Sequence, residues 1–173
     1  YVETSMESRA TPDFLAINPL SQVPVLRDGD AIIADSNAIL IYLVARYAPD
    51  GDWLPRDPVG AAHVQRWMSI AAGELRYGPA LARAIKLLDL PLDPEPPQAL
   101  AKKLFGVMDA HLADHSFLAA DRATLADIAL YSYTAHAPEG DVSLDPYPAI
   151  RAWLARVEAL PGFVPMSRIG KAD

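Results

Sequence analysis

Two short apolar segments near the start of the chain predict the strands of a β-hairpin. Residues 23–26 and 31–34 flank Asp28-Gly29, and an Asp-Gly pair between apolar runs is typical of a tight hairpin turn. Residues 36–48 then follow helical spacing with apolar side chains nearly all round, so we expect other elements to cover this helix on both sides. A short proline-led helical turn is predicted before the hairpin, at residues 11–17.

Beyond residue 57 the pattern becomes that of long helices. Asp57-Pro58 is typical of an N-cap followed by proline at the first helical position. Helical spacing then continues to about Leu88, and Pro79 should kink this helix because proline removes a backbone hydrogen bond. After a break at residues 91–97, further helices are predicted over residues 98–118, from Thr124-Leu-Ala-Asp127 onward, and over residues 149–160.

The change of pattern predicts two domains. We expect a small α/β domain over residues 1–48, a linker over residues 49–57 and an all-helical domain over residues 58–173. Two short strands are too little sheet to be stable alone. The first domain is therefore expected to lack part of its structure at the N-terminus.

Composition narrows the choice of partners. The net charge of −7 argues against nucleic acid and anionic membranes, because both attract basic surfaces. No apolar run approaches the length of a membrane span. The chain has no cysteine, which excludes disulfides, thiolate metal sites and a cysteine nucleophile within these residues and fits the reducing cytoplasm, where we expect the protein.

Gln22-Val23-Pro24 stands at the start of the hairpin and has two interpretations. A trans proline that simply opens a strand is the common case, since only about 5–6% of X-Pro bonds in folded proteins are cis. A cis bond would instead turn the backbone N–H and C=O of Val23 toward solvent. A bound peptide could then pair with Val23 like an additional strand.

Asp35-Ser36 begins the apolar helix after the hairpin. N-capping alone explains these residues. The alternative is a binding role, because free N–H groups and the positive end of the helix dipole can hold a carboxylate. Ser36 would donate to that carboxylate and Asp35 would neutralise a nearby ammonium. Together with Val23, this arrangement suits a ligand with an internal peptide bond and an α-amino-acid head.

The order of these motifs resembles a known family. Asn18-Pro-x-x-Gln-Val-Pro-Val-Leu26, a hairpin and Asp35-Ser-x-Ala-Ile-x-x-Tyr-Leu43 are similar to the N-terminal domain of bacterial-type cytosolic glutathione S-transferases. Thr124-Leu-Ala-Asp-Ile-Ala129 resembles the capping box of that family's sixth helix. Tyr147-Pro-x-Ile-x-x-Trp153 and Pro161-Gly-Phe163 match its C-terminal pattern. The resemblance implies a thioredoxin-like domain followed by an all-α domain, usually as a homodimer.

The resemblance also implies roles for individual residues. Val23 would pair with the cysteinyl backbone of glutathione, and Pro24 would be the family's cis-proline. Asp35 and Ser36 would bind the γ-glutamyl head, and Gln22 would lie near the glycyl end. Glutathione would be a co-substrate, and no bound cofactor is expected.

Two departures from the family pattern matter. Ser21 stands where many members have glycine, which allows the loop less conformational freedom. The family also has a strand and a helix before the point where this chain begins, and they carry the Tyr, Ser or Cys that activates the glutathione sulfur. The catalytic residue is therefore expected upstream of Tyr1 and is not assigned within this sequence.

The function expected from the resemblance is conjugation of the glutathione thiol to a small hydrophobic electrophile. Met68, Arg76 and Tyr77 could line the electrophile pocket, and ordinary core and surface positions explain them equally well. A glutathione-dependent reductase, isomerase or dehalogenase remains open and would need an upstream cysteine. A non-catalytic binding module with the same fold remains open as well.

Other polar residues have structural interpretations. Thr124 and Asp127 form a helix cap, and Asp127→Ala should cost about 1 kcal/mol or more. His111 and His115 have the spacing of a metal pair, but without further ligands a solvated helix face explains them better, and no metal site is expected. His63 and His136 are isolated in the sequence.

Overall fold

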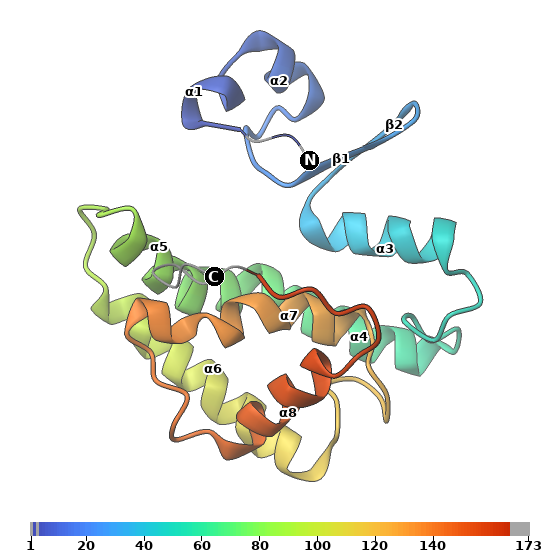
Figure 1. Cartoon of the computed structure of the whole chain (residues 1–173), viewed down its shortest axis with the longest axis vertical. Coiled ribbons are helices and arrows are strands. Elements are labelled where there is room, and N and C mark those ends of the chain that lie inside the picture. The colour runs from blue at the N-terminus through green and yellow to red at the C-terminus, as the bar shows by residue number, and fades with distance from the viewer. Residues whose placement is uncertain (1, 3, 167–173) are drawn as a thin grey trace. The chain divides into compact units, whose positions relative to one another are not determined.

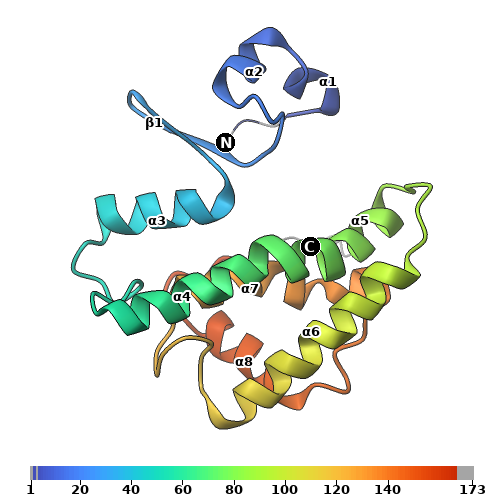
Figure 2. The same ribbon diagram turned by 180° about the vertical axis from the view of Figure 1, so that it is seen from behind.

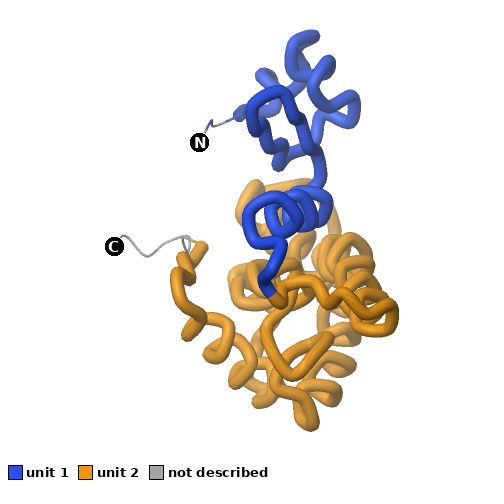
Figure 3. The backbone as a smooth tube through the Cα atoms, turned by 90° about the vertical axis from the view of Figure 1, so that its right-hand side faces the viewer, with its two compact units in different colours: residues 1–51 blue, residues 52–173 orange. Residues whose placement is uncertain are grey.

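The predicted hairpin and the predicted helical region fall into two separate units of the structure. The computed structural model describes residue 2 and residues 4–166 (Figure 1). It divides into unit 1, residues 1–51, and unit 2, residues 52–173 (Figure 3). The boundary lies within the linker that the composition predicts at residues 49–57.

Unit 1 consists of short elements around one hairpin. Strands β1 and β2 pair antiparallel, from Val25 opposite Ala34 to Asp28 opposite Ala31. Gly29 makes the turn at φ 57°, a conformation that glycine adopts without strain. The unit contains α1 (Met6–Arg9), α2 (Pro12–Ile17), β1 (Val25–Asp28), β2 (Ala31–Ala34) and α3 (Ser36–Tyr47).

Most of the predicted elements of unit 1 are confirmed, and two details differ. β1 begins at Val25 instead of Val23, because residues 23 and 24 turn the chain before it. α1 was not predicted from the sequence. It has no apolar face, and a reciprocal capping box of Ser5 and Ser8 supplies its hydrogen bonds.

Helix α3 is less covered than its apolar sequence predicts. Of its described residues none is fully buried, and Leu43 remains 37% exposed. Asp35 caps the helix from a backbone with φ 81°. Its Oδ1 accepts hydrogen bonds from the N–H groups of Asn37 at 2.9 Å and Ala38 at 3.0 Å.

Unit 2 is helical in all the regular elements that the structure describes. Figure 2 shows α4, η1 and α5 as one winding run, and α6 and α7 both contact η1. α8 packs against α6 and α7. The elements are α4 (Pro58–Ile70), the π-helix η1 (Ala71–Ala80), α5 (Leu81–Leu87), α6 (Glu95–Asp114), α7 (Leu125–Ala135), the 3-10 helix η2 (Ala137–Gly140) and α8 (Pro148–Glu158).

The helix expected to kink at Pro79 contains a π-helical segment around that residue. Proline has no N–H and its ring clashes with the carbonyl four residues before it, and a π register relieves both problems. Gly78 belongs to the same segment, and a Cβ there would lie 3.0 Å from the backbone nitrogen of Ala101 in α6. η1 and α6 therefore approach closely at a glycine.

Helix boundaries in unit 2 differ from the predicted ones at both ends of α6. α6 begins at Glu95 within the predicted break, because prolines are tolerated in a first turn whose N–H groups lack intrahelical partners. It ends at Asp114, since His115 is extended. η2 was not predicted from the sequence.

The core of unit 2 gathers large side chains from several helices. Trp67 and Trp153 are 2% and 0% exposed. Other fully buried side chains include Met68, Leu75, Phe105, Met108, Leu130 and Ile150.

In the part of the chain that the structure describes, no helix combines the length and the apolar character needed to cross a bilayer.

Candidate functional site

The Val23–Pro24 peptide bond is cis, as the resemblance implies for this position. Asn18 holds the loop that precedes it: its side chain is 6% exposed, its Nδ2 donates to the Gln22 carbonyl at 2.8 Å, and its Oδ1 accepts from the Leu20 N–H at 3.2 Å. Asn18 was quoted in the sequence motif but given no role. The signal was available, since an Asn before proline commonly bonds to nearby backbone in turns.

Ser21 occupies the left-handed region at φ 55°. This region favours glycine, which gives a physical reason for the glycine found at this position in many members of the family that the sequence resembles. The Ser21 hydroxyl donates to the Arg9 carbonyl at 2.9 Å and so attaches this loop to α1. Serine therefore keeps the loop conformation and adds a contact that glycine cannot make.

The backbone of Val23 is available to a ligand. The residue is 47% exposed, and among the described residues no group donates to its C=O or accepts from its N–H. A backbone N–H and C=O without protein partners must bind water or a ligand. An extended peptide can supply both partners at once by lying alongside as an additional strand.

Asp35 and Ser36 form the exposed start of α3. One oxygen of Asp35 caps the N–H groups of Asn37 and Ala38, so the capping interpretation of Asp35 is confirmed. Capping leaves the Ser36 hydroxyl exposed at the positive end of a 12-residue helix. The arrangement therefore offers a negative carboxylate and a hydroxyl donor side by side, which suits a zwitterionic α-amino-acid group.

The hairpin brings these two elements together. Val25 pairs with Ala34, so Pro24 and Asp35 lie at the same end of the hairpin, each one residue beyond the paired strands. Residues opposite each other in an antiparallel ladder have Cα atoms only about 4.5–5.5 Å apart. Gln22, also exposed, precedes this pair. All the predicted glutathione-binding residues thus lie at one end of the hairpin in unit 1.

The three residues considered for an electrophile pocket have different surroundings. Met68 is 1% exposed and packs in the core of unit 2. Tyr77 is 56% exposed, and the Arg76 guanidinium lies 5.5 Å from the centroid of its ring. Arg76 and Tyr77 therefore form an exposed cation–π pair, whereas Met68 contributes to the interior.

A cavity of about 310 Å³ in unit 2 was not foreseen from the sequence. Its lining is mostly apolar and includes the rings of Trp53, Tyr131 and Phe163. Tyr131 and Phe163 meet edge to face with centroids 5.1 Å apart. None of the predicted site residues lines it.

Thr124 and Asp127 form the predicted capping box, and Asp127 does more than cap. The carboxylate accepts from the Thr124 N–H at 2.8 Å, the Leu118 N–H at 2.9 Å and the Trp153 Nε1 at 2.9 Å. Asp127 is 0% exposed. It therefore connects α7 to the preceding loop and to α8.

His111 and His115 stack with ring centroids 4.2 Å apart. His115 is exposed, as expected, but His111 is half-buried beside Trp67 and its Nε2 contacts the Leu118 carbonyl at 2.9 Å. Burial, with a smaller contribution from the His115 charge, lowers the pKa of His111. Within the described ranges, no group of three or more His, Cys, Asp or Glu residues could hold a metal ion.

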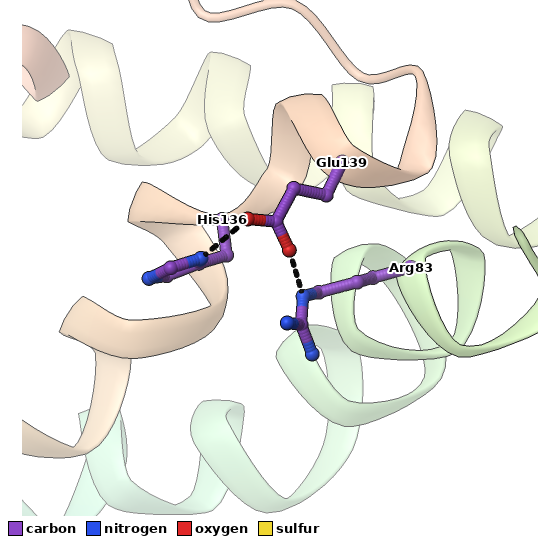
Figure 4. Close-up of polar contacts among 3 residues, drawn as sticks. All are labelled: Arg83, His136 and Glu139. Atoms are coloured by element: carbon purple, nitrogen blue, oxygen red, sulfur yellow. Dashed lines mark hydrogen bonds and ion pairs between the residues drawn. The ribbon is translucent and has the colours of Figure 1, made fainter. Parts of the chain in front are cut away.

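His136 is not isolated in the fold (Figure 4). It is 3% exposed, and its Nδ1 lies 3.0 Å from Oε1 of Glu139. Arg83 donates from Nε to the other carboxylate oxygen at 2.6 Å. Burial alone would raise the pKa of Glu139, but the hydrogen bonds from His136 and Arg83 outweigh it and lower that pKa. The three side chains connect α5 to η2.

Comparisons with known proteins agree across both units. The family model of the glutathione S-transferase N-terminal domain matches residues 1–45, and the model of the C-terminal domain matches residues 97–161. Glutathione S-transferase 3 of Zea mays is 31% identical over 94% of this chain and 78% of its own length. Glutathione S-transferase theta-2B of Homo sapiens is 32% identical, and the match covers 87% of this chain and 65% of the human protein.

Solved structures give the same result. A glutathione S-transferase from Xanthobacter autotrophicus Py2 superimposes with a TM-score of 0.88 at 32% identity, covering 95% of this chain and 82% of that one. A glutathione transferase homologue from Drosophila mojavensis, solved with bound glutathione, has a TM-score of 0.76 at 32% identity. That match covers 90% of this chain and 73% of the other.

Proposed function

Because this chain belongs to the glutathione S-transferase family, we propose that it binds glutathione at the hairpin end of unit 1 and conjugates the glutathione thiol to a small hydrophobic electrophile. The observation that carries the proposal is the backbone of exposed Val23, which has no hydrogen-bond partner among the described residues and lies at the same end of the hairpin as the N-terminus of α3. A peptide backbone and an amino-acid head are the two parts of glutathione that this arrangement suits.

The backbone of Val23 binds the middle of the ligand. The Val23 N–H donates to the cysteinyl carbonyl, and the Val23 C=O accepts from the cysteinyl N–H, as between neighbouring strands. Two parallel contacts to one residue fix its orientation, and with it the direction of the thiol. Gln22, the exposed residue before Val23, donates from its side-chain amide to the glycyl carboxylate.

The start of α3 binds the γ-glutamyl head. Ser36 donates its hydroxyl to the α-carboxylate, which the positive end of the helix also attracts. The Asp35 oxygen that does not cap the helix balances the ammonium group. The chain carries a net charge of −7, so a local dipole of this kind is what lets an anionic group bind.

We assign these residues the role of orienting glutathione. We do not assign any of them the role of activating its thiol. A free thiol has a pKa of about 8.5, so thiolate is scarce at neutral pH and a transferase must lower that pKa. For the electrophile we retain Arg76 and Tyr77, which are exposed, as candidate contacts. Met68 lies in the core of unit 2. We extend the proposal to a homodimer working in the cytoplasm, on the support of family membership; sedimentation of the purified chain tests the dimer.

Calorimetric titration with glutathione tests the proposal. Ser36→Ala should weaken binding by about 1–2 kcal/mol, because it removes a hydrogen bond to a charged group. Ser69→Ala, which removes an exposed hydroxyl in α4 of unit 2, should bind like wild type. Unchanged affinity in a folded Ser36→Ala variant would contradict the assignment.

A further inference from the structure

Two tyrosines of α3 donate to one carboxylate oxygen at the far end of the hairpin. The Tyr42 hydroxyl lies 2.8 Å from Oδ2 of Asp28, and the Tyr47 hydroxyl donates to the same oxygen. Asp28 is the last residue of β1, directly before the turn. The sequence pattern assigned Asp28 to the turn and gave neither tyrosine a role.

These bonds hold α3 against the hairpin at a distance from the proposed glutathione site. The chain already joins hairpin and helix at Asp35, at the site end. Tyr42 lies about 9 Å and Tyr47 about 16 Å along the helix from Ser36, at 1.5 Å per residue. Asp28 lies about 10 Å along β1 from Val25. In Figures 1 and 2 the hairpin tip and the C-terminal end of α3 extend from the site end in the same direction.

A helix held only at Asp35 could pivot there, whereas a second attachment fixes its direction. With a lever of about 9–16 Å, a shift of about 1 Å at the tyrosines turns α3 by roughly 4–6°. That rotation re-aims the Ser36 hydroxyl and the helix dipole relative to Val23. Both halves of the ligand must be met at once, so their relative placement affects affinity.

The protonation states favour this attachment at neutral pH. Hydrogen bonds from Tyr47 and Tyr42, and then the charge of Arg46, lower the pKa of Asp28. The same bonds raise the pKa of both tyrosines. Asp28 is therefore a carboxylate and both phenols keep their protons, which makes the bonds charge-assisted. Tyr47 is 62% exposed, so packing alone does not explain its position.

We propose that Asp28 is a positioning residue for glutathione: through Tyr42 and Tyr47 it fixes the direction of α3 and thereby places Ser36 correctly beside Val23. The inference rests on the proposed function. It predicts that residues at the far end of the hairpin control glutathione affinity without touching glutathione.

Substitutions at Asp28 test this through glutathione affinity. Asp28→Ala should raise the Kd for glutathione about three- to tenfold, and Asp28→Asn should restore part of the affinity because its amide oxygen still accepts a hydrogen bond. Asp30→Ala removes the same charge from the neighbouring turn and should leave the Kd within about twofold of wild type.

Coupling to the tyrosines separates positioning from a general loss of stability. Replacing both Tyr42 and Tyr47 by phenylalanine should raise the Kd in the wild-type chain but not in the Asp28→Ala chain. If Asp28→Ala does not fold, the phenylalanine variant alone still has to raise the Kd. If the wild-type chain binds glutathione and both Asp28→Ala and the phenylalanine variant have the same Kd as wild type, this inference alone is overturned. A wild-type chain that does not bind glutathione overturns the proposed function and this inference together.

Discussion

Replacement of Asp127 by alanine should destabilise unit 2 far more than the loss of an ordinary helix cap. The carboxylate is 0% exposed and accepts from the N–H groups of Thr124 and Leu118 and from the indole of Trp153 at 2.8–2.9 Å. The Thr124 hydroxyl adds a fourth bond at 3.1 Å. Thr124, Leu118 and Trp153 are each at most 2% exposed, so water cannot replace the lost acceptor.

The expected cost follows from the donors left unpaired. A buried donor without a partner costs about 1–3 kcal/mol. The three buried N–H donors together would therefore cost about 3–9 kcal/mol, whereas the Thr124 hydroxyl can rotate to another acceptor. Removing a buried carboxylate returns part of its desolvation energy. We therefore expect a loss of about 3–5 kcal/mol in the free energy of unfolding, and a fall in Tm of about 10–15 °C for a unit of this size.

Urea unfolding followed by the far-UV signal measures this loss. Asp127→Asn keeps one acceptor oxygen and should lose about 2 kcal/mol. Asp121→Ala removes an exposed carboxylate from the same loop and should change stability by no more than about 0.5 kcal/mol. A loss of only about 1 kcal/mol in Asp127→Ala, as for a simple cap, would refute the role of the Leu118 and Trp153 bonds.

Three further outcomes can be checked by unfolding experiments. Gly140→Ala should destabilise the chain by about 2 kcal/mol or more, because its Cβ would lie 2.5 Å from the rigid backbone nitrogen of Arg83; wild-type stability would contradict this contact. Gly106→Ala meets nothing within 4 Å inside α6 and should stabilise the chain by up to about 1 kcal/mol; a destabilised variant would contradict the open surroundings. The lowered pKa of His111 means that the unfolded chain binds more protons below about pH 6.5, so stability should fall as the pH drops from there. His111→Gln should flatten that slope, whereas an unchanged slope would assign it to other groups.

Local signals in the sequence predicted the elements that local contacts make. Asp28-Gly29 predicted the hairpin, and Thr124 with Asp127 predicted the start of α7, because turns and caps are made by neighbouring residues. The π-helical segment at residues 71–80 could not be predicted this way. It depends on how η1 packs against α6, where Gly78 approaches Ala101, and it shifts the face that each later residue presents.

Contacts between distant residues account for what the sequence missed. His136 lies far in sequence from Arg83, so nothing local indicated that Glu139 joins the two. Met68 has the spacing of a helical position, but spacing alone could not tell that it faces the core. The residues proposed to bind glutathione could be named in advance because each stands next to a turn or a helix start.

Glutathione titration of the isotopically labelled chain, followed by amide chemical shifts, tests the central claim most directly. The account predicts that the largest shifts as glutathione saturates fall at Val23, Asp35 and Ser36 at the end of the hairpin. Saturable binding that leaves these amides unchanged, or shifts confined to residues 52–166, would contradict it.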